Sequence, residues 1–194
     1  MLLEESKVYK PFKHAWAVEY AEQHEDLHWT EKEINLSDDV TQWKDGTLSE
    51  SEKNHITQIL RLFTQSDVVV AGNYCNYYIP KFLNNEVRMM LMSFAAREGN
   101  HARAYALLND TLGLHEKEYS TFLEYDALAE KVEFMKDADV HSIHGTAKSL
   151  ALTVFNEGVS LFSAFVMLLN YQRMGKMKGM NTVIEWSIRD ETLH

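Results

Sequence analysis

Apolar residues recur along most of the chain at spacings of three, four and seven, which is the period of one face of an α-helix. Alternation of apolar and polar residues, which is typical of a half-buried strand, does not persist over any length. Only 2 prolines and 8 glycines interrupt the 194 residues, so few positions force a helix to end. The pattern therefore predicts an all-α protein.

Five helices are predicted after residue 48. Ser49 and Glu52 have the spacing of a capping box and begin the first helix, which Pro80 ends. The expected ranges are 49–79, 85–110, 116–136, 141–174 and 178–194. Helices of this length with short connections favour an antiparallel bundle.

The first 48 residues are more polar and less regular, and Trp16, Trp29 and Trp43 are spaced along them. We expect two parts in the chain. Residues 1–48 form an N-terminal arm that has one short helix and wraps the body. Residues 49–194 form the helical bundle.

Four of the predicted helices have acidic residues on their apolar faces, two of them with a histidine three positions later. These residues are Asp67, Glu98, His101, Glu157, Glu191 and His194. Moving a bare carboxylate into a core costs several kcal/mol even after relaxation, so four together require cations. No matching set of Lys or Arg lies on these faces. The pattern therefore predicts a metal site inside the bundle.

The two Glu-x-x-His pairs, Glu98–His101 and Glu191–His194, sharpen this prediction. A separation of three residues places carboxylate and imidazole one helical turn apart, so both can bind one ion. The set is rich in oxygen and has one nitrogen for each metal. It suits a di-iron or iron–manganese centre better than zinc.

The Glu-x-x-His spacing also occurs at Glu25–His28 and Glu52–His55, where the neighbouring residues are polar. We expect these two copies to be solvated or to cap helices. His141 and His144 also share a helix face, but they open a predicted helix, and we expect them at the surface.

Composition narrows the class of protein further. The net charge is −10 and the sequence pI is about 5.3, which argues against nucleic-acid binding. The single cysteine, Cys75, excludes an intrachain disulfide and a multi-thiolate zinc site. The N-terminal segment lacks the pattern of a secretion signal, and charges interrupt the apolar runs that might cross a membrane. We expect a cytoplasmic protein that binds neither nucleic acid nor membrane.

The order of these residues resembles the small, radical-generating subunit of class I ribonucleotide reductase over about residues 25–194. The resemblance rests on Asp67 and on three segments: REGNHARAY, with Glu98, His101 and Tyr105; FNEG, with Glu157; and RDETLH, with Asp190, Glu191 and His194. Four details resemble this family more than other ferritin-like di-iron proteins: Asp67 as first ligand, Tyr105 one turn after His101, Asp190 before the second pair, and Trp29 in the arm. Trp29 matches the family tryptophan near the iron-ligand histidine.

The resemblance implies the ribonucleotide reductase variant of the ferritin-like four-helix bundle, with extra helices, and a homodimer. It implies that the six residues above hold two Fe ions, or Mn or mixed Mn/Fe ions, which activate O2. Tyr105 would then carry a tyrosyl radical. We expect Phe165 and Ile184 to wall its pocket and Ser187 to be its polar neighbour.

The resemblance also implies a route for the oxidising equivalent. His101, Asp190 and Trp29 would carry it toward the surface, where the large catalytic subunit would use it to reduce ribonucleotides for deoxyribonucleotide synthesis. The sequence does not distinguish iron from manganese, or diphosphate from triphosphate substrates.

Members of the family continue beyond the position that matches His194, with further helices and a tail that docks the large subunit. A fragment, a split gene or an interruption by an inserted element would each explain a sequence that ends in a predicted helix. We expect this chain to bind a complementary C-terminal polypeptide through the exposed apolar faces of its last two long helices. We also expect it to be inactive in nucleotide reduction alone.

Two other classes of function stay open. One is a different ferritin-like di-metal protein, such as an iron-oxidising store or a ligand-binding oxidase. Trp29, Tyr105 and Asp190 argue against it. The other is a helical interaction protein that binds no metal, and the presence of every predicted ligand argues against that reading.

Overall fold

The computed structural model describes residues 1–115, 117–121, 124–136 and 139–193, with all side chains except those at 64, 65, 118, 121 and 128. Over these residues the chain forms helices, turns and irregular segments without a strand, so the predicted all-α class is confirmed. In chain order the helical elements are α1 (Ala15–Asp26), η1 (Glu31–Glu33), α2 (Ser37–Lys44), α3 (Glu50–Asn73), η2 (Tyr74–Tyr78), α4 (Ile79–Lys81), α5 (Asn85–Leu112), α6 (Glu118–Thr121), α7 (Asp126–Lys136), α8 (Ile143–Phe155), η4 (Asn156–Leu161), α9 (Phe162–Arg173) and α10 (Lys178–Glu191).

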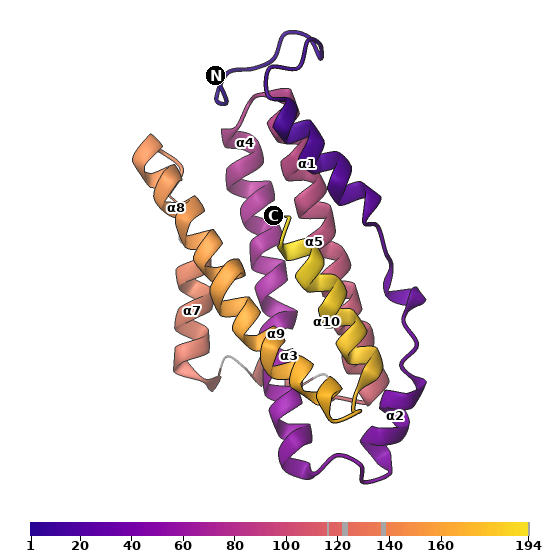
Figure 1. Ribbon diagram of the computed structural model, residues 1–194. Helices are drawn as coiled ribbons and strands as arrows, with labels where there is room; N and C mark the ends of the chain where they lie inside the picture. The colour runs from indigo at the N-terminus through magenta and orange to yellow at the C-terminus, as the bar shows by residue number, and fades with distance from the viewer. Residues whose placement is uncertain (116, 122–123, 137–138, 194) are drawn as a thin grey trace.

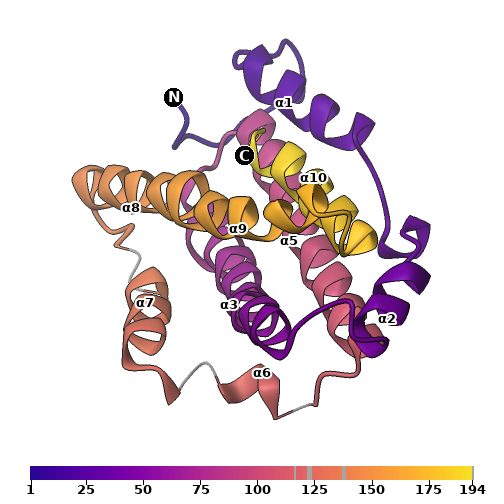
Figure 2. The same cartoon turned by 60° about the horizontal axis from the view of Figure 1, so that its bottom comes forward.

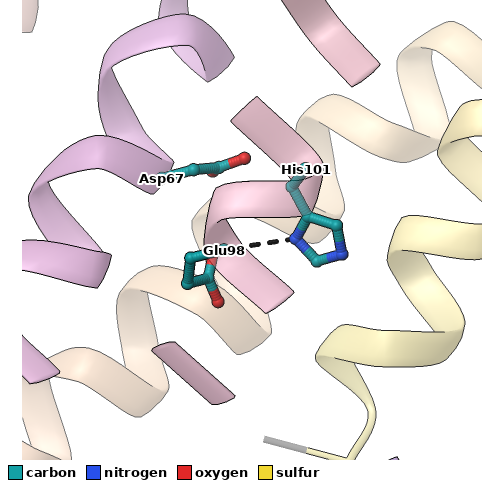
Figure 3. Close-up of side chains that lie close together, drawn as sticks. All are labelled: Asp67, Glu98 and His101. Atoms are coloured by element: carbon teal, nitrogen blue, oxygen red, sulfur yellow. Dashed lines mark ion pairs between the residues drawn. The ribbon is translucent and has the colours of Figure 1, made fainter. Parts of the chain in front are cut away.

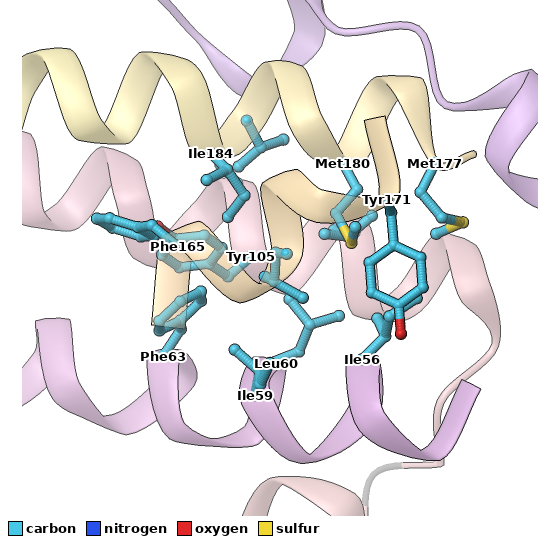
Figure 4. Packing of buried hydrophobic residues seen from close by; sticks show 14 of the residues in the cluster. Ile56, Ile59, Leu60, Phe63, Tyr105, Phe165, Tyr171, Met177, Met180 and Ile184 are labelled. Carbon is cyan, nitrogen blue, oxygen red and sulfur yellow. The ribbon is translucent and has the colours of Figure 1, made fainter. Parts of the chain in front are cut away.

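Four helical columns form the bundle, as Figures 1 and 2 show. They are α3, α5, the continuous run α8–η4–α9, and α10. Along its length α3 packs against α5, and α10 packs against α9 and α5. The main core cluster between them includes Phe63, Tyr105, Phe165 and Ile184, all almost fully buried (Figure 4). The short helices α6 and α7 lie outside this bundle (Figure 2).

The helix that begins at Ser49 starts as predicted. The Ser49 hydroxyl accepts from the Glu52 amide while the Glu52 carboxylate accepts from the Ser49 amide, which is the capping box. The helix continues beyond α3 through the π-helical segment η2 into α4 and ends at Lys81, past Pro80. Pro80 lies one residue before the end of this helical run, so its ring and missing amide affect only the last turn.

Three expected boundaries are wrong. The predicted helix over 116–136 is two shorter helices, α6 and α7, and a bend at Tyr125 immediately precedes α7. The last helix ends at Glu191 rather than at the end of the sequence, and residue 194 lies outside the described residues. The arm contains two α-helices, α1 and α2, instead of one, because contacts with α10 hold the second, α2, in place.

The arm contacts the bundle at two levels, as Figure 1 shows. Along the upper part of α5 lies α1, whereas α2 contacts α5 and the start of α10. Of the three tryptophans in the arm, Trp29 is the one that is almost fully buried, Trp43 packs partly buried against the core, and Trp16 is 45% exposed. The arm therefore delivers one aromatic side chain deep into the protein.

The run from Ile143 to Arg173 is long and apolar enough, by length and composition only, to cross a membrane. The expectation that charges interrupt every such run is therefore wrong, because only Lys148, Glu157 and the terminal Arg173 are charged here. This is weak evidence for a membrane span, since the core helix of a bundle passes the same test. Only 28% of the apolar window is buried within the chain, which leaves an exposed apolar face.

The start of α10 is fixed by a buried carboxylate from α2. Asp39 is fully buried, and its two oxygens accept hydrogen bonds from the amides of Gly179 at 3.2 Å and Met180 at 3.0 Å. These amides would otherwise have no partner at a helix N-terminus. A Cβ on Gly179 would lie 2.6 Å from the Asn35 carbonyl oxygen, so this close approach requires glycine.

Burial raises the pKa of Asp39 to about 6, although the hydrogen bonds from Met180 and Gly179 act in the opposite direction. Because the pKa of Asp39 is higher in the folded than in the unfolded chain, the stability that protonated Asp39 contributes is fully present below about pH 4. It is lost as the pH rises through 6. Asp39→Asn cannot ionise. We expect the free energy of unfolding of the wild type to fall by about 3 kcal/mol relative to this variant between pH 4 and 7, measured by urea denaturation. A constant difference over that range would contradict this expectation.

Candidate metal centre

Side chains from α3 and α5 meet inside the bundle, as Figure 3 shows. Asp67 projects from α3, Glu98 and His101 project from α5, and one potential ligand atom of each lies within 4.8 Å of the others. All three side chains are buried. Residues three apart lie one turn apart on a helix face, so the spacing of Glu98 and His101 presents both to Asp67. The structure thus brings these three predicted ligands together.

The imidazole of His101 connects this cluster to α10. Its Nδ1 lies 3.6 Å from Glu98 Oε2 and 3.2 Å from Glu191 Oε1, whereas its Nε2 lies 3.0 Å from Asp190 Oδ2. Burial disfavours the charged imidazolium, but hydrogen bonds with Asp190, Glu191 and Glu98 outweigh it and raise the pKa of His101 well above its usual range. One ring nitrogen therefore faces the carboxylates while the other is held by a second residue.

Glu157 reaches the same region from the fourth column. It lies in η4, the π-helical segment between α8 and α9, and its side chain is buried. Single-turn π-helical segments occur often at functional sites, because they change the direction of a side chain within an otherwise regular helix. Burial, followed by the charges of Glu191, Glu98 and Asp67, raises the pKa of Glu157 well above its usual range. Five of the six predicted ligands are thus electrostatic neighbours. The sixth, His194, lies outside the described residues.

The carboxylates of this cluster leave acceptor atoms that suit a cation. Asp67 Oδ2 and Glu157 Oε1 are buried and accept no hydrogen bond from the described residues. Burial and the nearby charge of Glu98 also raise the pKa of Asp67 well above its usual range. Buried acceptors without donors are costly, and a bound cation would satisfy them. The set of carboxylate oxygens and imidazole nitrogen therefore fits hard divalent metal ions.

A chain of hydrogen bonds leads from His101 to the arm. Asp190 Oδ2 lies 3.0 Å from His101 Nε2 and accepts from Trp29 Nε1 at 2.7 Å. The Trp29 and His101 rings are stacked, with centroids 6.1 Å apart. Burial opposes the charge on Asp190, but bonding to His101 and Trp29 keeps its pKa below the usual range. Residues from α5, α10 and the arm are thereby linked by one carboxylate.

Arg97 is a member of this region that sequence reasoning missed. It is buried, its Nε lies 3.6 Å from Asp190 Oδ2, and its Nη2 donates to the His24 carbonyl oxygen. A buried arginine therefore does lie beside the site, where it contacts Asp190. No local signal in the sequence marks Arg97 as part of the site, because its partner Asp190 lies far away along the chain.

Tyr105 lies on α5 one turn beyond His101 and is almost fully buried. Its hydroxyl donates to Ser187 Oγ at 2.9 Å, which is the polar neighbour expected from the sequence. Phe63 packs beside it with ring centroids 5.0 Å apart, and Phe165 and Ile184 belong to the same core cluster (Figure 4). Burial, then the charge of Asp67, raises the pKa of Tyr105 well above its usual range, so the phenol stays neutral.

The other two Glu-x-x-His pairs, and His141 with His144, lie where the sequence predicted. Glu52 caps α3 and binds Lys176 at 2.6 Å, and His55 bonds to the Tyr171 hydroxyl at 2.9 Å. Glu25 and His28 are exposed, as are His141 and His144. None of these pairs joins the central cluster of described residues.

A four-helix bundle with a buried carboxylate–histidine cluster defines a protein of the ferritin-like class. The family model described as ribonucleotide reductase, small chain, matches residues 6–194. The chain therefore belongs to the ribonucleotide reductase small-chain family.

Relatives and solved structures agree with this assignment. A probable ribonucleoside-diphosphate reductase small subunit of Invertebrate iridescent virus 3 is 41% identical over 211 residues, covering 100% of this chain and 56% of that protein. The ribonucleoside-diphosphate reductase subunit beta of Chlamydia pneumoniae is 27% identical, covering 95% of this chain and 57% of that protein. The ribonucleotide reductase R2 subunit from Clostridium botulinum has the same fold, with a TM-score of 0.88 at 24% identity over 97% of this chain and 61% of that chain. The chain spans about half the length of the curated relatives it matches.

Proposed function

We propose that this chain supplies the metal-binding, radical-generating part of the small subunit of a ribonucleoside-diphosphate reductase. The observation that carries the proposal is the link between three features: the buried carboxylate–histidine cluster, the shielded phenol of Tyr105, and the chain from His101 through Asp190 to Trp29. An iron store would need the cluster but not the other two features.

The residues that would hold the metal are Asp67, Glu98, His101, Glu157, Glu191 and His194. Two bound ions of iron, manganese or one of each would supply O2 activation and one-electron oxidising power. Nδ1 of His101 faces the carboxylates, while Asp190 holds Nε2. Such an outer partner fixes the ring orientation and the tautomer of a ligand histidine.

Tyr105 would be the side chain that loses an electron and carries the radical. Its proton is held in the hydrogen bond to Ser187 Oγ, which also fixes the orientation of the phenol. The surrounding apolar side chains exclude water and solutes, which is what a persistent radical requires. In the resting chain the raised pKa keeps the phenol protonated.

Trp29, Asp190 and His101 would pass the oxidising equivalent from the cluster toward the surface. The partner that receives it would be the large catalytic subunit, and the small subunit would act as a homodimer. We further propose a cytoplasmic location without membrane attachment. The chain covers about half the length of its relatives, and we propose that nucleotide reduction itself requires the large subunit and the remaining part of the small subunit.

The role of Asp190 separates this function from a different di-metal protein. We expect Asp190→Asn to retain metal and the Tyr105 radical but to lose ribonucleotide reduction by roughly 100-fold or more in the complete complex. The reason is that an amide cannot accept and hold a proton between Trp29 and His101. Asp38→Asn, which changes an exposed carboxylate in the first turn of α2, is the control and should keep full turnover. Equal turnover in both variants would contradict the proposed route.

The exposed apolar face of α8–η4–α9 would bind the complementary polypeptide. Its large side chains are 61–77% exposed, which is unusual for residues of this type; they are Ile143, Val154, Phe155, Val159 and Val166. Relatives contain further chain of comparable length, and amphipathic helices from it would cover this face.

Mixing the two polypeptides tests this surface. We expect a 1:1 complex by analytical ultracentrifugation and a weakening of roughly 10-fold or more for Val159→Lys, since a buried lysine must be desolvated. Gln23→Lys introduces the same side chain at an exposed position of α1, a helix that does not contribute to this face; it is the control and should bind normally. Val159→Lys binding as tightly as the wild type would contradict this assignment of the surface.

A further inference from the structure

A cavity lies away from the carboxylate cluster. It has a volume of about 250 Å³, lies between α3, η2, α7, α8 and η4, and opens to the surface beside the exposed side chains of Phe134 and Phe155. Its apolar lining comes from Val70, Phe134, Met135, Leu152 and Phe155. Asn156 and Ser160 of η4 line it, whereas Glu157 between them does not. The same π-helical segment therefore separates the cavity from the candidate metal centre.

Most of the polar groups in the cavity wall are already bonded within the protein. Tyr78 pairs with the Thr153 hydroxyl at 2.9 Å, Asn73 Nδ2 donates to the Met135 carbonyl oxygen at 2.8 Å, and Ser149 Oγ donates to the Asp139 carbonyl oxygen at 3.3 Å. These groups close the cavity without offering a strong site to a ligand. The polar groups that remain are those of Lys131, Ser160 and Asn156.

Lys131 is the one charged side chain among the described residues that line the cavity. Its ammonium is partly buried against the apolar lining and donates to Ser160 Oγ, and it forms no ion pair with a described carboxylate. Burial without a compensating charge lowers the pKa of Lys131. The Asn156 side chain, next to it in the wall, forms no hydrogen bond with another described side chain or backbone group. A cation, a hydroxyl and an amide thus converge at one end of an apolar cavity.

From this arrangement we infer that the cavity binds a short amphipathic monocarboxylate. The carboxylate accepts from Lys131, Ser160 and Asn156, and the aliphatic tail lies against Val70 and Leu152. A carboxylate supplies the counter-charge that Lys131 lacks, and charge-assisted hydrogen bonds are roughly twice as strong as neutral ones. The volume lies below the 300–1,000 Å³ or so that is typical of drug-sized ligands, so the tail is short.

Calorimetric titration with octanoate tests this inference on the full chain. We expect saturable binding of one octanoate, and weaker binding of 1-octanol, which has the same tail without the charge. Lys131→Gln should weaken octanoate binding by roughly 10-fold or more and leave octanol unchanged. Lys148→Gln makes the same change of charge at an exposed position of α8 and should bind octanoate like the wild type.

Three outcomes would overturn the inference: no saturable octanoate binding, octanol binding as tightly as octanoate, or equal octanoate affinities of the two lysine variants. Acetylation followed by mass spectrometry gives an independent readout. Octanoate should slow the modification of Lys131 at least several-fold and leave that of Lys148 unchanged. Equal modification of Lys131 with and without octanoate would place the ligand elsewhere.

Discussion

Glu157→Gln is expected to abolish binding of the metal pair while stabilising the metal-free chain. The two effects have one cause. In the wild type, burial and three neighbouring carboxylates raise the pKa of Glu157, so the charged form is disfavoured unless a cation is present. Glutamine keeps the shape of the side chain and removes the charge. The substitution therefore relieves repulsion between the carboxylates in the metal-free chain. It also removes a charged oxygen that would bind the metal.

The sign of the pH dependence follows from the raised pKa. Stability that depends on protonated Glu157 is present below its unfolded pKa and is lost as the pH rises through the folded value. In metal-free buffer, Glu157→Gln should thus be the more stable chain above about pH 5, by roughly 1.4 kcal/mol for each unit by which the pKa is raised. With Fe(II) or Mn(II) present the order should reverse, because ligand binding stabilises only the chain that binds it.

Urea denaturation with and without metal, together with metal analysis after gel filtration, measures both effects. Glu130→Gln on α7 is the matched control, because its carboxylate is exposed and has no part in the cluster. It should retain the metal and the stability of the wild type. Glu157→Gln that binds metal like the control, or that is less stable than the wild type without metal, would contradict the place of Glu157 in the site.

Tyr105→Phe should bind the same metal and consume O2 but give no tyrosyl radical. Phenylalanine preserves the packing against Phe63 and removes only the hydroxyl that donates to Ser187. The loss of one hydrogen bond should lower the free energy of unfolding by about 1 kcal/mol, since Ser187 is left without a donor. Nucleotide reduction in the complete complex should fall to background.

Tyr74→Phe is a demanding control for that experiment. Tyr74 is also buried, and its pKa is raised by burial and then by the charges of Glu157, Glu98 and Glu191, so it lies near the same carboxylates. It nevertheless lacks the hydrogen bond to Ser187 that orients Tyr105. We expect Tyr74→Phe to retain the doublet signal in electron paramagnetic resonance (EPR). A persistent signal in Tyr105→Phe, or its loss in Tyr74→Phe alone, would move the radical to Tyr74.

Buried helix faces could be predicted because their apolar residues recur along the sequence with a fixed period. Asp67, Glu98 and Glu157 each interrupt an apolar stripe, and such an interruption is visible in sequence. The cap at Ser49 was also readable, since a capping box has a local cause.

Features that depend on tertiary contacts were not readable. The π-helical segments η2 and η4 have no reliable local signal, although η4 carries Glu157. Arg97 looked like a flanking residue because its partner, Asp190, is 93 positions away in the sequence. The second helix of the arm was missed because Asp39 and its bonds to α10 hold it in place. These elements owe their conformation to partners that no local pattern specifies.

Low-temperature EPR of the metal-free chain after addition of Fe(II) and then O2, with iron quantified in the same tube, tests the proposed function most directly. The measurement is made with and without the complementary polypeptide. The proposed site predicts a tyrosyl doublet and about two irons per chain, the stoichiometry of di-iron carboxylate bundles. Full iron loading without a doublet in the presence of the complementary polypeptide would contradict a radical-generating role. No iron binding under either condition would contradict the metal centre itself.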